Sequence, residues 1–339
     1  MKNLHLLFGI LLLFSAYFFF SCKPEKGVVL AYVTSRGPNL PNTTFITHIN
    51  YAFGGVNTTF NGIRISNEER LMNITGLKRQ KPTLKVLLSI GGWGSGRFSE
   101  MAADVTNRLA FAADCKRVVD QFNLDGIDLD WEYPSSAAAG ISASPDDVDN
   151  FTLLMRDIRQ AIGKNKLLTF ASASNAKYVD FKAINKYIDF VNIMTYDIAH
   201  PPYHQAGLYR SEFTKDFSCE ESVNAHIKAG IPANKLTLGI PFYGHGCCGV
   251  PRDVYYKDIV STSKPEFEKF TRKWDDVAKA PYWVDEEGKF VLTYDDAHSI
   301  AEKCIFIREK GLLGAMYWQY DQDDDDNTLR KAVYYGIYP

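Results

Sequence analysis

The sequence predicts an α/β fold, a (β/α)8 TIM barrel with a small α+β insertion between strands 7 and 8. Three observations support this prediction: apolar, β-rich runs recur eight times, segments with helical periodicity separate them, and one gap is too long for a simple helix. Strands that are apolar on both faces and alternate with helices are typical of a parallel sheet. Eight such units in about 300 residues fit a closed barrel better than an open sheet.

The expected strands lie at 28–34, 48–56, 84–92, 126–133, 167–174, 188–196, 236–244 and 312–320. Helical periodicity is clear between them, as in NRLAFAADCKRVVDQF, DDVDNFTLLMRDIRQAIG and SVNAHIKAG. A doubly wound sheet is the competing architecture. It normally places a glycine-rich phosphate loop after its first strand, and YVTSRGPN lacks that spacing. We therefore expect the barrel to span 27–339, with 246–294 as an insertion on its rim.

Residues 1–21 are expected to be a signal peptide rather than part of the fold. The apolar run from Leu6 to Phe20 has 15 residues, and a membrane-spanning helix needs about 20. Ser21-Cys22 followed by KPEK resembles a bacterial lipoprotein cleavage site with Cys22 as the lipidated residue. We expect a secreted or surface-exposed protein, a lipoprotein of the outer membrane or cell surface of a bacterium, that contacts the membrane only through Cys22. Plain secretion is the alternative.

Charge and cysteine content favour neither nucleic-acid binding nor a disulfide scaffold. The net charge is −2, from 38 basic and 40 acidic side chains, so nothing attracts the chain to nucleic acid. Five cysteines follow Cys22, an odd number that argues against a disulfide scaffold. Cys115 and Cys304 are expected to be buried thiols, whereas pairing among Cys219, Cys247 and Cys248 stays open. We interpret the acidic run 321–327, DQDDDDN, as a solvated loop.

Candidate catalytic residues lie in the stretch 125–133, DGIDLDWEY. Residues two apart in a strand share a face and are separated by about 6.6 Å, so Asp128, Asp130 and Glu132 line one side. In a closed barrel that side is the interior, with Glu132 nearest the carboxyl-terminal mouth. Clustered buried carboxylates raise the pKa of one member and keep it protonated near neutrality, which suits general acid catalysis.

DGIDLDWEY resembles the DxxDxDxE signature of glycoside hydrolase family 18, the chitinase family, with Asp125 as its first acid. Further matches follow in order along the expected strands. They are AY at Tyr32, YAF at Phe53, SIGGW at Ser89 to Trp93, MTYD at Met194 to Asp197, and MYW ending at Trp318.

The resemblance implies a retaining glycosidase that cleaves β-1,4 linkages of chitin or chitooligosaccharides by substrate-assisted catalysis through an oxazolinium intermediate. It makes Glu132 the general acid and base, and Asp130 the residue that holds the substrate's 2-acetamido group. Asp128 would share a proton with Asp130, and Tyr196 would donate to the acetamido oxygen. Because the nucleophile belongs to the substrate, neither a metal nor an organic cofactor is implied.

The resemblance also assigns substrate-binding residues, with Met194 and Asp197 beside the reacting sugar and Trp318 beneath it. The full set is Tyr32, Phe53, Gly92, Trp93, Met194, Asp197, Arg252 and Trp318. Trp93, Tyr282 and Trp283 are candidates for outer sugar platforms, and His245 and Arg252 lie just after the seventh expected strand.

Two other functions compete with a monomeric chitinase. An endo-β-N-acetylglucosaminidase that acts on the chitobiose core of N-glycans would share the fold and chemistry. A non-catalytic sugar-binding protein on the same scaffold would generally lack the acid found here at Glu132.

Overall fold

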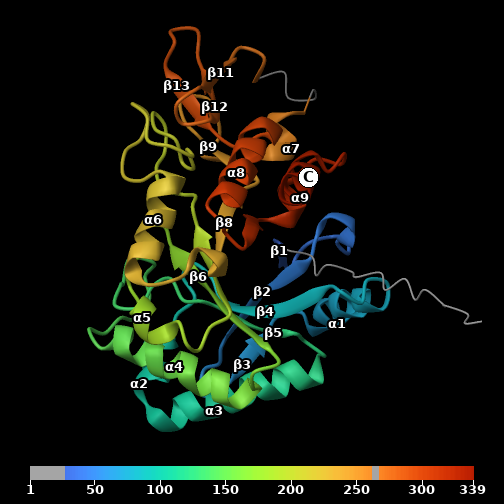
Figure 1. Ribbon diagram of the computed structural model, residues 1–339, viewed down its shortest axis with the longest axis vertical. Coiled ribbons are helices and arrows are strands. Elements are labelled where there is room, and N and C mark those ends of the chain that lie inside the picture. Colours follow the sequence, from blue (N-terminus) through green and yellow to red (C-terminus); the bar gives the residue numbers. More distant parts are fainter. Residues whose placement is uncertain (1–26, 262–266) are drawn as a thin grey trace, which may run out of the picture.

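A closed barrel of eight parallel strands forms the body of the molecule in the computed structural model, which describes residues 27–261 and 267–339 (Figure 1). Each strand is hydrogen-bonded to the next, and β14 pairs back onto β1. The predicted (β/α)8 fold is therefore confirmed. The barrel strands are β1 (Val28–Thr34), β2 (His48–Val56), β4 (Lys85–Gly91), β5 (Gly126–Asp130), β6 (Leu167–Ala173), β7 (Phe190–Met194), β8 (Leu236–Pro241) and β14 (Gly314–Trp318).

Every expected strand corresponds to a barrel strand, and four of the eight end two or three residues earlier than expected because the chain leaves the sheet at the carboxyl-terminal mouth. One short strand was not foreseen. β3 (Ile63–Ile65) pairs antiparallel with the end of β2 and places Arg64 opposite Gly55. The expected signal peptide at 1–21 and the lipidation site Cys22 lie outside the described residues.

Helices cover the outside of the barrel, and side-chain caps fix where several of them begin. Asp104 caps α3, and Ser218 forms a capping box with Glu221 at the start of α6. The covering helices are α1 (Glu68–Gly76), α2 (Phe98–Ala103), α3 (Val105–Gln121), α4 (Asp147–Ile162), α5 (Phe181–Ile184), α6 (Cys219–Ala229), α8 (Ala297–Glu309) and α9 (Thr328–Ile337). Short 3-10 turns lie at Thr43–Phe45, Leu77–Arg79, Ala233–Lys235 and Tyr320–Gln322.

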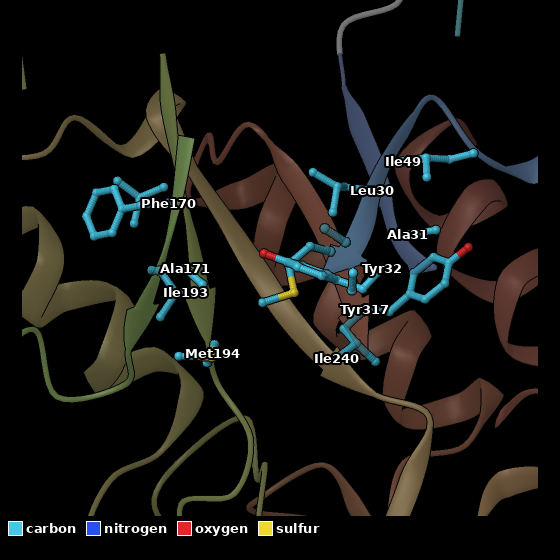
Figure 2. Packing of buried hydrophobic residues seen from close by; sticks show 14 of the residues in the cluster. Leu30, Ala31, Tyr32, Ile49, Phe170, Ala171, Ile193, Met194, Ile240 and Tyr317 are labelled. Atoms are coloured by element: carbon cyan, nitrogen blue, oxygen red, sulfur yellow. The ribbon is translucent and has the colours of Figure 1, made fainter. Parts of the chain in front are cut away.

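The alternation of side chains along each strand divides the core into an inner and an outer part. Tyr32 points from β1 into the barrel, whereas Phe170 points away from it on the outer side of β6 (Figure 2). Trp131 belongs to the outer part, where its ring stacks on Phe98 at 5.3 Å between centroids and also contacts Phe151. The apolar residues that alternate with the carboxylates of β5 therefore pack against helices, and the carboxylates face inward.

The insertion between β8 and β14 is a five-stranded antiparallel sheet at one end of the barrel, at the top of Figure 1. It begins at residue 243, three residues before the expected boundary. Its elements are β9 (Tyr243–Gly246), β10 (Asp253–Tyr255), α7 (Tyr256–Ile259), β11 (Thr271–Asp275), β12 (Ala280–Val284) and β13 (Phe290–Thr293).

The aromatic residues of β12 pack within this part of the molecule. Tyr282 stacks on Phe290 at 4.7 Å, and Trp283, which is 8% exposed, packs against Phe267 and Phe270. Trp283 offers no free face, so the prediction that it serves as a sugar platform was wrong. Tyr282 is half-buried with one face on Phe290, and for this residue the role stays a prediction.

Cysteine pairing and the acidic run are also settled within the described part of the chain. Cys115, Cys219 and Cys304 are buried thiols, and Cys247 and Cys248 are free as well. Asp323 is not solvated as expected: it is 5% exposed and accepts hydrogen bonds from two backbone amides and the guanidinium of Arg330 at the start of α9. Among the described residues, no helix is long and apolar enough to cross a membrane, and no cluster of His, Cys, Asp or Glu could hold a metal ion.

A buried ion pair joins the insertion to the barrel. Lys303 on α8 contacts Asp295, which follows β13, and both side chains are fully buried. The hydroxyl of Ser299 also donates to Asp295. A buried carboxylate with these partners is tolerated, but it becomes costly when the cation is removed.

We therefore expect Lys303→Met to lower the free energy of unfolding by about 3–5 kcal/mol, because it leaves Asp295 buried without its cation. Urea denaturation measures the loss. The matched control is Lys116→Met, which removes an exposed pair with Asp120 on α3 and should cost at most about 1 kcal/mol. Equal losses in the two variants would contradict the role assigned to the buried pair.

Candidate active site

Asp128 lies at the centre of the barrel and accepts four hydrogen bonds from four different strands. Its Oδ2 accepts from Tyr32 Oη at 2.9 Å and Ser89 Oγ at 2.8 Å. Its Oδ1 accepts from Thr169 Oγ1 at 2.5 Å and Asn192 Nδ2 at 3.1 Å. Burial raises the pKa of Asp128, and the four donors oppose that shift because they stabilise the charged carboxylate.

Asp130 is the neighbouring inward carboxyl group and has the opposite environment. It is 4% exposed, and its Oδ1 has no hydrogen-bond partner among the described residues. Burial and then the charges of Glu132 and Asp128 raise its pKa well above the usual range. Since Asp128 holds the donors, we assign the negative charge to Asp128 and the proton to Asp130. The unpaired Oδ1 of Asp130 is itself buried, so the side chain has to turn toward the pocket that it lines before this oxygen can meet a ligand.

Glu132 follows β5 at the carboxyl-terminal mouth of the barrel. Burial raises its pKa to about 7, with a smaller contribution from the charge of Asp197, while a hydrogen bond from Tyr133 opposes the shift. A carboxyl group with a pKa near neutrality can both give up and take back a proton at that pH. Among the three inward acids, Glu132 is therefore the one suited to general acid and base catalysis.

Tyr196 faces these acids from the loop that follows β7. Burial and then the charges of Asp130, Asp197 and Glu132 raise the pKa of its hydroxyl, so it stays protonated and remains a donor. The ring fits because residue 239 on β8 is a glycine. A Cβ there would lie 2.9 Å from the ring of Tyr196 and 2.4 Å from a backbone oxygen.

The floor of the site is aromatic. Trp318, at the end of β14, stacks on Phe53 with 5.6 Å between ring centroids and a 16° angle, and it also contacts Tyr32. Trp93 is 65% exposed at the rim, where its edge meets Tyr133. Flat aromatic surfaces beside carboxyl groups and a hydroxyl donor suit a ligand that has apolar faces and polar edges.

These side chains enclose a pocket of about 190 Å³ at the carboxyl ends of the strands. Its lining contains most of the predicted residues together with Ala171, which was not predicted. The lining residues are Tyr32, Phe53, Trp93, Asp130, Glu132, Ala171, Met194, Tyr196, Asp197 and Trp318.

Three predicted site residues lie outside that lining. Asp128 is beneath it and acts through Asp130. Gly92 supports Phe53, because its φ is +92° and a Cβ there would lie 2.7 Å from the phenyl ring. Arg252 is exposed, and its backbone oxygen accepts a hydrogen bond from the amide of Gly246.

The sequence analysis missed a network that fixes Asp197. Its Oδ1 accepts from Tyr243 Oη at 2.6 Å and contacts His245 Nε2 at 2.7 Å. The other ring nitrogen of His245 lies 2.9 Å from Asp253. Burial lowers the pKa of His245, but the two carboxylates outweigh it and the net shift is upward. Tyr243 and His245 are two residues apart in β9 and share one face of the strand. Strand alternation could therefore have indicated that both side chains point toward the same partner.

Comparison with known proteins places this site in a family. The family model of the glycosyl hydrolases family 18 matches residues 28–323. The chain belongs to this family. Chitinase A1 of Niallia circulans is 34% identical over 300 residues, which are 75% of this chain but only 43% of that protein. Probable chitinase 2 of Drosophila melanogaster is 31% identical over 349 residues, with 89% of this chain and 70% of that protein covered.

Solved structures of family 18 agree with the fold. A family 18 N-acetylglucosaminidase from Paenibacillus barengoltzii superimposes with a TM-score of 0.82 at 35% identity, covering 91% of this chain and 99% of that one. The cell-surface chitinase ChiW of Paenibacillus sp. str. FPU-7 gives a TM-score of 0.81 at 31% identity, with 92% and 43% covered. The chain thus spans less than half of two of these four proteins and nearly all of the N-acetylglucosaminidase.

Asp125, the first acid of the family 18 signature in this chain, does not reach the pocket. It lies before the amino end of β5, where Lys78 Nζ is 2.8 Å away and the amide of Val86 donates to it at 2.9 Å. Its role is to fix the start of β5 against β4.

We expect Asp130→Asn to raise the free energy of unfolding by an amount that grows with pH. The pKa of Asp130 is higher in the folded than in the unfolded state, so its contribution to stability is complete below the unfolded pKa. That contribution declines toward the folded pKa, with a limiting slope of about 1.4 kcal/mol per pH unit. The amide side chain of the Asp130→Asn variant cannot ionise, so the variant does not lose this stability as the pH rises. Urea denaturation at pH 4.5 and 7.5 measures the difference.

The control is the same substitution at Asp128. Asp128→Asn presents an NH2 group to hydroxyl and amide donors, so it should destabilise the protein at both pH values. A pH-independent effect of Asp130→Asn would show that Asp130 is not the protonated member of the pair.

Proposed function

We propose that this family 18 chain is a retaining glycoside hydrolase that cleaves β-1,4 linkages in chitin and chitooligosaccharides by substrate-assisted catalysis. The observation that carries the proposal is the buried carboxyl group of Asp130, whose Oδ1 has no partner among the described residues, next to Asp128 with its four donors and to Glu132 in the same pocket. In the usual retaining scheme an ionised second carboxylate attacks the sugar. A protonated Asp130 is a poor nucleophile, but once its side chain turns toward the pocket its unpaired oxygen can accept a hydrogen bond from a substrate amide.

The reaction follows from the positions of three side chains. Glu132 donates its proton to the glycosidic oxygen as the bond to the anomeric carbon breaks. The carbonyl oxygen of the substrate's own 2-acetamido group bonds to that carbon and gives an oxazolinium ion, held by Asp130 at its N–H and by the hydroxyl of Tyr196 at its oxygen. Glu132, now a carboxylate, takes a proton from water, and the water oxygen replaces the acetamido oxygen with overall retention.

A second candidate within the same chemistry is an N-acetylglucosaminidase, which includes endo-enzymes acting on the chitobiose core of N-glycans. It is favoured by the similarity to the Paenibacillus barengoltzii enzyme, which covers nearly the whole of both chains. Product analysis separates the candidates, because a chitinase releases short oligosaccharides from chitin whereas the endo-enzyme releases glycans from a high-mannose glycoprotein. The presence of Glu132 and Tyr196 in one pocket argues against a protein that only binds sugar.

We expect hydrolysis of chitohexaose to decline above pH 7, by about tenfold in kcat/KM per pH unit. The reason is that Glu132 has a pKa of about 7 and must be protonated to act as the acid. Glu132→Gln should lose at least about 10³-fold in kcat, while Glu100→Gln on the exposed side of α2 should keep full activity. Chromatography of the products measures both. Chitohexaose left intact by the wild type from pH 4 to 8 would rule out the proposed reaction.

We also propose that the mature protein is anchored through a lipid on Cys22. β1 begins at Val28, at the end of the barrel opposite the pocket, so an anchor there would leave the mouth of the site clear. In a bacterial host, Cys22→Ala should move the protein from the membrane fraction to the soluble fraction. Cys248→Ala, which changes an exposed thiol, should leave it in the membrane fraction. Wild-type protein that is fully soluble would contradict the anchor.

A further inference from the structure

Two hollows continue the catalytic pocket beyond Phe53 and Trp318. The first, of about 470 Å³, shares Phe53, Trp93 and Trp318 with the pocket and extends to Arg36 and Arg64. The second, of about 400 Å³, also contains Trp318 and Arg36. The three spaces share lining residues and therefore adjoin one another, and together we call them the channel. We call the two outer hollows the arginine groove.

Positive charge dominates the arginine groove. Among the described residues, Arg36 and Arg64 form no ion pair and no side-chain hydrogen bond. By contrast, neighbouring Arg70 donates to the backbone oxygens of Thr34 and Asn39. An arginine that is already engaged contributes less to an incoming ligand than one that is free.

Two more charged residues line the second hollow. Lys257 donates to the backbone oxygen of Asp321. Asp321 is the one carboxyl group among the described residues that line the groove. Burial raises its pKa, although the nearby cations Arg70, Lys257 and Arg330 oppose the shift. The groove therefore carries three cations against one partly buried acid.

The backbone holds Arg64 in an open position. β3 pairs with β2 so that Arg64 lies opposite Gly55, and a Cβ at Gly55 would lie 3.2 Å from a guanidinium nitrogen of Arg64. Gly54 beside it lines the groove as well. Gly55 thus has no side chain to cover the guanidinium of Arg64, which lies on a strand anchored to the barrel.

We propose that Arg36 and Arg64 make the arginine groove select N-acetylated sugar units over deacetylated, cationic glucosamine units. The inference rests on the proposed function, since a polymer of N-acetylglucosamine that reacts in the pocket must extend into a neighbouring groove. An N-acetylated unit is neutral and meets no electrostatic barrier there. A glucosamine unit below the pKa of its amine carries an ammonium group, which the two guanidinium groups that line the groove would repel.

The test uses three defined ligands: fully acetylated chitopentaose and its two isomers with a single glucosamine at one end or the other. Binding to the Glu132→Gln protein is measured by calorimetry at pH 5.5 and low salt, where no turnover interferes. We expect one isomer, the one whose glucosamine enters the groove, to bind about three- to tenfold more weakly than chitopentaose. In 1 M salt the Debye length is about 3 Å, so the repulsion is screened and that difference in binding should vanish.

The variants identify the residues responsible. In the Glu132→Gln background, Arg36→Gln with Arg64→Gln should bring the weaker isomer to within about twofold of chitopentaose. Arg79 is an exposed arginine on the 3-10 turn Leu77–Arg79, away from the groove, and Arg79→Gln should leave the difference intact. Equal binding of all three ligands, or a difference that persists in the double variant, would overturn the proposal.

Failure of the proposed function gives a different result. If the wild type leaves chitohexaose intact but the three ligands bind as described, the hydrolase proposal falls and the selectivity of the groove stands. If chitopentaose itself does not bind, both proposals fall.

Discussion

The structure depends on one buried charge, the carboxylate of Asp128, which is stabilised by donors from β1, β4, β6 and β7. A closed barrel excludes water from its centre, so an ion there survives only when protein donors replace the lost hydration. Four donors converge because the barrel brings four strands to the same level. Among the described residues, Asp130 above it has no such donors, and burial together with the charges of Glu132 and Asp128 raises its pKa well above the usual range.

The same electrostatics extend into the insertion. Asp197 contributes to the raised pKa of Glu132, and Tyr243 and His245 of β9 fix the position of Asp197. The insertion is therefore part of the catalytic apparatus as well as a rim of the cleft. Its attachment through Lys303 and Asp295 is buried and polar, so the sheet is held in one place relative to the barrel. A looser attachment would let Asp197 move and would change the acidity of Glu132.

Strand alternation was enough to predict which side chains of a barrel strand face inward. It was not enough where the burial of a side chain depends on packing between segments that are distant in the sequence. Asp128, Asp130 and Glu132 were placed correctly because a two-residue period in a closed barrel leaves a single inward face. Trp283 was misjudged because its ring is buried against Phe267 and Phe270, which lie in another segment of the insertion. Asp323 looked solvated in an acidic run, yet the start of α9 and Arg330 bury it. The cage of donors around Asp128 was also beyond the sequence, because it combines residues from separate strands.

Charge is distributed unequally along the channel. The acidic residues that influence catalysis lie at one side, and the arginines that would select between acetylated and deacetylated sugar units lie at the other. Asp197 and Asp253 lie on the side of the insertion, where they act on His245 and Glu132, whereas Arg36 and Arg64 lie past Phe53 and Trp318. A neutral N-acetylated sugar polymer gains little binding energy from either the carboxylates or the guanidinium groups, so aromatic stacking and hydrogen bonds have to supply it. The guanidinium groups act only on a unit that carries charge. A chain can therefore be excluded from the groove according to its acetylation without any change in the residues that perform the reaction.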